Sequence, residues 1–272
     1  MSPRLGGWAI MGAMPSFRLF GIPVTIRPSF LVIAALIGFT SRRPIVYLVA
    51  WVAIVFLSIL IHELGHAITA RSYGAEVAIE LNGIGGLTSW SVPDRELGPG
   101  QRALVAAAGS GVGVLFGCAV WLFERFTGPY DEVAGFVVSN LILVNVFWGL
   151  LNWLPIRPLD GGHLFTSLLQ KVIPSRAELI ANVVFFITAA AALVVALLTQ
   201  RIFLALIAGW LLMGELTRGR GGQRRPPTPI PQMTFDPPQG EDDATVAKES
   251  VLEQDHESQP NPEPETRAEP DN

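Results

Sequence analysis

Apolar residues fill long uninterrupted stretches of this chain instead of alternating with polar ones. The clearest stretch, Ile45–Ile61, is 17 residues long and carries no charge, which is close to the length that a helix needs to cross a bilayer. With its continuation to Arg71, it is one of six such stretches. The other five are Pro28–Thr40, Gln101–Phe123, Ala134–Trp153, Ala177–Thr199 and Ile202–Leu216. The pattern predicts an all-α polytopic membrane protein with about six transmembrane helices.

Between the second and third stretches the periodicity changes from continuous to alternating. In Glu76–Trp90, Val77, Ile79 and Leu81 alternate with polar residues, and Asn82-Gly83 is a strong hairpin-turn signal. We therefore expect a β-hairpin at about 76–90. Phe17–Ile26 is expected to add a further strand, so that a small membrane-associated sheet accompanies the helices.

Composition changes again near the end of the chain. Residues 226–272 contain 10 prolines, 12 acidic residues and 2 basic residues, a composition typical of disorder. Three parts are expected: an N-terminal segment at 1–27, a six-helix core at 28–216, and a disordered, Pro-rich acidic cytoplasmic tail at 217–272. The single cysteine, Cys118, rules out an intrachain disulfide.

Basic residues are distributed unevenly between the predicted loops. If both termini are cytoplasmic, 13 of the lysines and arginines before residue 226 lie on the cytoplasmic side and four on the outer side. This asymmetry favours that orientation. Trp8–Met14 is too short for a signal peptide and no A-x-A site follows it. We expect a multi-pass protein of a bacterial cell membrane, with both termini cytoplasmic.

The second predicted helix contains a metal-binding pattern, His62-Glu63-Leu64-Gly65-His66. On a helix, His62 and His66 lie one turn apart on the same side, so both imidazoles can hold one Zn²⁺. Glu63 lies beside them and can take a proton from a metal-bound water. Ionisable residues in a membrane helix are costly, and by default they mark a functional site.

A catalytic zinc site takes three protein ligands and keeps a position open, so a third ligand is needed. Of the four histidines, His256 lies in the polar tail, which leaves His163 and the intramembrane acids. Residues 152–163, reading NWLPIRPLDGGH, directly follow the apolar run Ala134–Leu151. This segment offers both Asp160 and His163.

The two segments together resemble the site-2 protease family of intramembrane zinc metalloproteases, peptidase family M50. That family pairs HExxH on one transmembrane helix with N-x-x-P-x-x-x-L-D-G on a later one. Both patterns are present here without a departure, and the resemblance covers roughly residues 15–216. It implies one zinc ion per chain bound by His62, His66 and Asp160. It also implies that Glu63 is the general acid/base and that Asn152 is a partner of the scissile carbonyl or its oxyanion.

The residues around Asp160 agree with this role. Pro155 and Pro158 break a helix and let backbone line a cavity, and Gly161-Gly162 would permit a tight turn and a close approach to a metal. Two alternatives stay open: Asp160 caps a helix in an interfacial loop, or His163 replaces it as ligand. We rank His163 below Asp160, as a residue that supports the ligand.

Two stripes of small or polar residues indicate how the helices pack. Gly109, Gly113 and Gly117 recur every four residues and let a neighbouring backbone approach closely; that neighbour could be the helix with the histidines. Asn145 and Asn152 share a face of the fourth helix and need polar partners. We interpret Asn145 as structural and Asn152 as functional.

These features predict an intramembrane zinc endopeptidase, whose partners are the lipid bilayer and a transmembrane protein substrate, with no nucleic acid. The hairpin is either a cover over the helix ends or an edge strand that receives an unwound substrate segment. Two rival functions are a catalytically inactive membrane scaffold and an intramembrane zinc transporter. An intact HExxH and LDG argue against a scaffold, and clustering of the candidate ligands at one end of the helices argues against transport.

Overall fold

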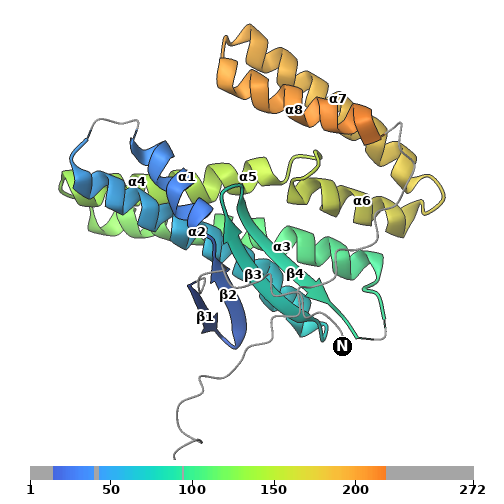
Figure 1. The fold of residues 1–272 in the computed structure, drawn as a ribbon, viewed down its shortest axis with the longest axis horizontal. Coiled ribbons are helices and arrows are strands. Elements are labelled where there is room, and N and C mark those ends of the chain that lie inside the picture. Colours follow the sequence, from blue (N-terminus) through green and yellow to red (C-terminus); the bar gives the residue numbers. More distant parts are fainter. Residues whose placement is uncertain (1–14, 40–42, 94, 219–272) are drawn as a thin grey trace, which may run out of the picture. The chain divides into compact units, whose positions relative to one another are not determined.

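The computed structural model describes residues 15–39, 43–93 and 95–218. The stretch Trp8–Met14 and the predicted tail from residue 219 onward lie outside these residues. Figure 1 shows a set of helices together with one small sheet. The helices are α1 (Pro28–Phe39), α2 (Ile45–Ser72), α3 (Pro99–Thr127), α4 (Glu132–Ile142), the π-helical stretch η1 (Leu143–Trp148), α5 (Gly149–Asn152), α6 (Asp160–Val172), α7 (Ala177–Leu198) and α8 (Ile202–Arg218).

Four helical segments of the described chain are long and apolar enough to cross a membrane. They are α2, α3, α7 and the continuous segment Glu132–Asn152 that joins α4, η1 and α5. The apolar helices Pro28–Phe39 and Leu204–Thr217 are shorter. The mostly helical fold is therefore confirmed, while six membrane crossings stay a prediction.

The helix α2 carries the histidines and lies at the centre of the fold. It begins directly after Pro44 and ends at Ser72, where Gly74 takes a positive φ of 84° and the chain turns into the sheet. Both α3 and the hairpin strands pack against α2. Any residue on the inner side of α2 can therefore meet side chains from both.

The four-stranded sheet contains β1 (Ser16–Leu19), β2 (Ile22–Ile26), β3 (Glu76–Asn82) and β4 (Gly85–Ser91), in the order β1-β2-β3-β4. β2 pairs with β3 in parallel, whereas the other two pairs are antiparallel. The predicted hairpin is confirmed, whereas the region Phe17–Ile26, predicted as one strand, contains the two paired strands β1 and β2. Because β4 is at the end of the order, one of its edges has no strand partner within the described residues.

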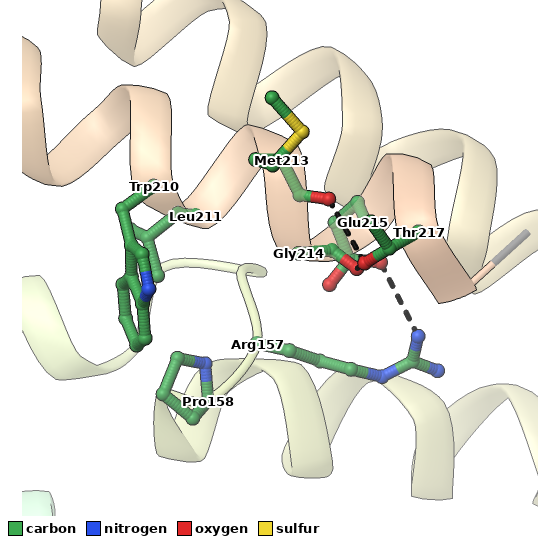
Figure 2. Close-up of a pocket in the computed structure, with 8 residues that line it drawn as sticks. All are labelled: Arg157, Pro158, Trp210, Leu211, Met213, Gly214, Glu215 and Thr217. Atoms are coloured by element: carbon green, nitrogen blue, oxygen red, sulfur yellow. Dashed lines mark hydrogen bonds and ion pairs between the residues drawn. The ribbon is translucent and has the colours of Figure 1, made fainter.

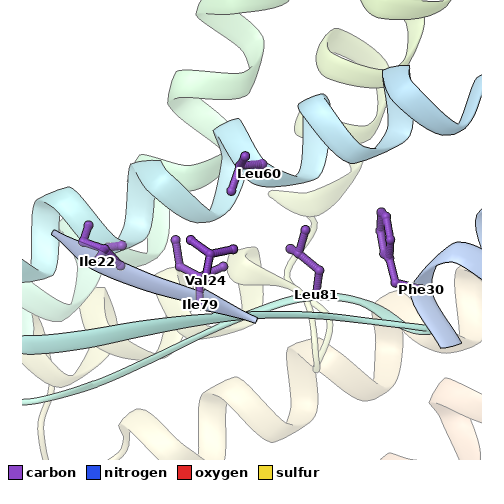
Figure 3. Close-up of a cluster of buried hydrophobic side chains, with 7 residues drawn as sticks. Ile22, Val24, Phe30, Leu60, Ile79 and Leu81 are labelled. Atoms are coloured by element: carbon purple, nitrogen blue, oxygen red, sulfur yellow. The ribbon is translucent and has the colours of Figure 1, made fainter. Parts of the chain in front are cut away.

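Apolar side chains attach the sheet to α2 (Figure 3). The buried cluster contains Ile22, Val24, Phe30, Leu60, Ala67, Ile79 and Leu81. These residues come from β2, β3, α1 and α2, so the cluster joins all four elements around one core. A paired guanidinium and carboxylate add to this connection: Arg27 Nε donates to Glu80 Oε1 at 2.6 Å and Arg27 Nη2 to Glu80 Oε2 at 2.8 Å.

The hairpin turn differs by one residue from the prediction. Its two loop residues are Gly83 and Ile84, not Asn82 and Gly83, since Asn82 pairs with Gly85 at the end of the strands. The Asn82 side chain still shapes the turn, because its Oδ1 accepts the Ile84 N–H at 2.9 Å. Gly85 has a φ of +141°, which favours glycine.

Candidate metal centre

The two histidines of α2 face the same side of the helix, as their spacing predicts. His66 is buried, and its Nδ1 lies 2.7 Å from the Val105 carbonyl oxygen of α3. This contact uses Nδ1 and orients the ring, which leaves Nε2 available as a ligand. His66 Nε2 lies 3.1 Å from His62 Nε2.

The third group reaches this position from the start of α6. The helix α5 ends at Asn152, Pro155 and Pro158 lie in the connecting loop, and Asp160 is the first residue of α6. Its carboxylate turns toward α2 instead of capping its own helix. Asp160 Oδ2 is 3.1 Å from His62 Nε2 and 3.2 Å from His66 Nε2.

The spacing of these three atoms fits a metal ion. Ligand atoms at zinc-like bond lengths of about 2.0–2.1 Å in a tetrahedral arrangement lie about 3.3 Å apart. The three observed separations are 3.1, 3.1 and 3.2 Å. Among the residues that the structure describes, His62, His66 and Asp160 form a group whose ligand atoms all lie within 4.8 Å of one another.

Asn152 and Ser110 both contact the Asp160 carboxylate. Asn152 Nδ2 donates to Asp160 Oδ2 at 2.7 Å and lies 3.3 Å from His62 Nε2. Ser110, fully buried on α3, donates its hydroxyl to the same oxygen at 3.2 Å. Sequence reasoning singled out Asn152 but missed Ser110, whose one available signal was its place beside Gly109 in the small-residue stripe.

Glu63 is buried, with 5% of its surface exposed, and it faces the hairpin. Thr88 of β4 donates its hydroxyl to Glu63 Oε2 at 2.6 Å and contacts the Glu63 carbonyl oxygen at 3.1 Å. The backbone of Gly86 also lies against this carboxylate. Sequence reasoning placed a hairpin near the site but did not single out Thr88.

The glycine stripe of α3 contacts two neighbours. A Cβ on Gly109 would lie 2.1 Å from His66 Nε2. One on Gly117 would meet Val146 and Asn145, with 2.7 Å to the nearest atom of Val146. The expectation that the histidine helix is a neighbour is confirmed, and η1 is the second neighbour.

The pair Gly161-Gly162 has a different role from the predicted tight turn. Both residues lie in the first turn of α6, and both are buried. A Cβ on Gly161 would lie 2.2 Å from the carbonyl oxygens of Trp153 and Leu154. Glycine is therefore needed because the helix start packs onto the preceding backbone, and this packing sets where Asp160 stands.

His163 lies one turn further along α6 and is exposed. It is outside the group formed by His62, His66 and Asp160. Asn145 is buried, and its Nδ2 donates to Ser58 Oγ and to the Leu141 carbonyl oxygen, both at 2.8 Å.

Arg157 connects the loop before Asp160 to the last two helices. Its Nη1 donates to Asn182 Oδ1 at 2.9 Å and to Glu215 Oε2 at 3.4 Å, while its Nη2 lies 3.3 Å from Glu178 Oε2. The guanidinium also stacks 4.6 Å from the ring centre of Phe185. Figure 2 shows Arg157 reaching toward Glu215 of α8 beside a surface pocket whose lining does not include the candidate metal ligands.

The chain is similar to known metalloproteases in both sequence and structure. Residues 130–195 match the model of peptidase family M50. A zinc metalloprotease from Methanocaldococcus jannaschii is 26% identical over 159 residues, which are 57% of this chain and 45% of the relative. A protein of Synechocystis whose name also describes a zinc metalloprotease is 29% identical over 186 residues, 63% of this chain and 48% of the relative.

A solved structure shares the fold. The site-2 protease from Methanocaldococcus jannaschii superposes with a TM-score of 0.53 and 23% identity, covering 78% of this chain and 98% of that one. The resemblance to the site-2 protease family is confirmed. With its apolar helices, the chain is an integral membrane protein. It spans about half the length of the two relatives that it matches in sequence.

Proposed function

We propose that this chain is an intramembrane zinc endopeptidase that hydrolyses a peptide bond in or near a transmembrane segment of another membrane protein. The observation that carries the proposal is the convergence of His62, His66 and Asp160 at separations of 3.1–3.2 Å. Two nitrogen donors and one carboxylate oxygen are a donor set that zinc enzymes use, and they leave a position open.

The depth of the site supports cleavage inside the membrane. His62 lies 10 residues before the end of α2 at Ser72, about 15 Å along the helix axis at 1.5 Å per residue. With both termini cytoplasmic and six crossings, as the basic residues indicate, this position lies below the cytoplasmic surface of the bilayer. Asp160 follows a non-helical loop, and such backbone is tolerated at this depth where it lines a cavity.

The residues around the metal position have distinct roles in this proposal. His62, His66 and Asp160 would hold a zinc ion, which would supply Lewis-acid chemistry at this position. Glu63 accepts a proton from the attacking water and later passes one to the leaving amine. Asn152, whose amide nitrogen lies 2.7 Å from Asp160 Oδ2, donates to the carbonyl oxygen of the scissile bond as negative charge develops on it.

The edge of β4 that has no strand partner among the described residues receives the substrate. Proteases cleave extended chain, whereas a transmembrane segment arrives as a helix with its amides hidden. An unwound segment can pair with the edge of β4 by strand addition. Since Thr88 of β4 contacts Glu63, this edge adjoins the proposed base. Such cleavage is a step of regulated intramembrane proteolysis, which is the process that we propose for this chain.

The test compares the wild type with Glu63→Gln for zinc content and for the proteins that accumulate in the membrane. A zinc protease keeps its metal and loses cleavage in this variant, so intact single-span substrates accumulate. His62→Ala, His66→Ala and Asp160→Ala should each lower bound zinc, while His163→Ala, a change on the next turn of α6, should not. Equal cleavage by the wild type and by Glu63→Gln would refute the proposal.

An inactive scaffold and a zinc transporter give different results in the same test. A scaffold would show no difference in membrane protein fragments between the wild type and Glu63→Gln. A transporter would keep its zinc flux in Glu63→Gln, because this residue lies outside the metal-binding group.

A further inference from the structure

One face of β4 is directed at the helix that carries the proposed catalytic residues. Side chains of a strand alternate between its two faces, so Gly86, Thr88 and Trp90 share one face. Gly86 and Thr88 contact Glu63, and Trp90 packs against a buried cluster that includes Ala70 near the end of α2. This face of β4 therefore lies along the last turns of α2.

Two contacts from this face restrict the Glu63 carboxylate. The Thr88 hydroxyl donates to Oε2 at 2.6 Å. On the other side, a Cβ added to Gly86 would lie 2.3 Å from Oε1 and 2.4 Å from Cγ. The carboxylate thus accepts a hydrogen bond from Thr88 at one oxygen, and its other oxygen packs against the backbone of Gly86.

We propose that Thr88 is a positioning residue for Glu63, and that Gly86 contributes to the same positioning because it has no side chain to displace the carboxylate. The inference rests on the proposed function, in which Glu63 is the general base. A glutamate side chain has three rotatable bonds, and the rate of proton transfer depends on where its oxygens stand. The hydrogen bond from Thr88 selects one orientation of the carboxylate before substrate arrives.

This arrangement links substrate binding to the base through one strand. A substrate segment that adds to β4 pairs with backbone groups at its edge, in the plane of the sheet, whereas the Thr88 side chain stands perpendicular to that plane. The substrate therefore does not need to displace Thr88 from Glu63. The same strand sets the register of the substrate and the orientation of the carboxylate.

The experiment measures kcat and KM for Thr88→Ser, Thr88→Ala and Thr88→Val. Serine and alanine at this position differ only in the hydroxyl, and valine preserves the shape of threonine without the donor. The probe is a single-span test protein whose apolar helix contains a Gly–Pro pair and whose cytoplasmic end is fluorescently labelled. Thr188→Val, which removes a threonine hydrogen bond to the Val184 carbonyl within α7, is the matched control.

We expect Thr88→Ala and Thr88→Val to lower kcat by roughly 10-fold to 100-fold, with KM and zinc content unchanged. Thr88→Ser should stay within a few-fold of the wild type. Gly86→Ala should also lower kcat, because its new methyl group displaces the carboxylate. If Thr88 merely stabilised the hairpin, KM would rise in all three Thr88 variants, and serine would not restore the activity of the wild type.

The outcomes separate this inference from the proposed function. Equal kcat for Thr88→Ser, Thr88→Ala and the wild type would overturn the positioning role and leave the protease standing. So would a parallel rise in KM in all three Thr88 variants. If the wild type and Glu63→Gln both leave the test protein intact, the proposed function fails, and the positioning role fails with it.

Discussion

Replacing Gly109 by alanine tests whether close packing of α3 on α2 determines metal binding. The added Cβ would lie 2.1 Å from Nε2 of His66 and 2.5 Å from two ring carbons. An ordinary contact of this kind lies at about 3.5 Å, so the methyl group and the ring must separate by about 1.4 Å. The ring is not free to swing aside, because its Nδ1 is held 2.7 Å from the Val105 carbonyl oxygen of the same helix, α3.

The displacement is large compared with the tolerance of a metal site. Ligand distances in such sites hold to within about 0.2 Å, and changes to residues that only support the ligands already cost about 10-fold to 100-fold in metal affinity. We expect Gly109→Ala to lower zinc affinity at least that much. Overpacking should also destabilise the fold by about 1–3 kcal/mol.

The matched control is Gly111→Ala on the same helix. A Cβ on Gly111 meets only the Trp153 ring, at 3.8 Å, and both variants gain the same helix propensity, about 1 kcal/mol. Zinc content after equilibration in metal buffers, together with thermal unfolding, compares the two purified proteins. A Gly109→Ala protein that binds zinc within about twofold of Gly111→Ala would refute the packing argument.

Three further predictions concern the topology, the tail and one ion pair. Reporter fusions after Phe126 and Gln200 should report the outer side of the membrane; a cytoplasmic signal at either would reject six crossings. Truncation after Arg225 should leave zinc content and cleavage near normal, since residues 226–272 have too few apolar residues to pack and contain none of the candidate metal ligands; lost activity would show that the tail is needed. The hydrogen bond from Arg27 holds the pKa of Glu80 below its usual value of about 4.3. The stability from this pair is therefore present above that pH and is lost as the pH falls through the lowered value. Glu80→Gln should flatten the dependence of Tm on pH below about 5, and an unchanged profile would exclude the pair as its cause.

The apolar helices and the hairpin were predictable because each follows from a local pattern. Continuous apolar runs predicted the apolar helices, and the alternation of Val77, Ile79 and Leu81 predicted the strand that now packs on α2. The helix α6 (Asp160–Val172) lies outside the six predicted stretches and was missed, because polar residues interrupt its apolar ones. The turn was misplaced by one residue, because a turn signal such as Asn82-Gly83 does not distinguish a loop residue from the last paired residue. The parallel pairing of β2 with β3 was not predictable, since α1 and α2 separate the two strands in the chain.

The candidate metal-binding group was predictable from two motifs, but its surroundings were not. Thr88 reaches Glu63 across 25 residues of sequence, and Ser110 reaches Asp160 across 50. Each contact depends on how separate helices and strands pack, which no local pattern reports. The misinterpreted pair Gly161-Gly162 illustrates the same point, because its close neighbour proved to be backbone and not the metal.

Because of the π-helical stretch η1, the number of residues between Asn145 and Asn152 determines where the Asn152 side chain points. A π turn accommodates one residue more than an α-helix would, and one residue corresponds to about 100° of rotation. Asn145 lies within this stretch and bonds to Ser58, while Asn152 follows it and bonds to Asp160. A chain one residue shorter between them would keep its hydrophobicity and its motifs. Its second amide would nevertheless be turned about a quarter of the way around the helix, away from the carboxylate.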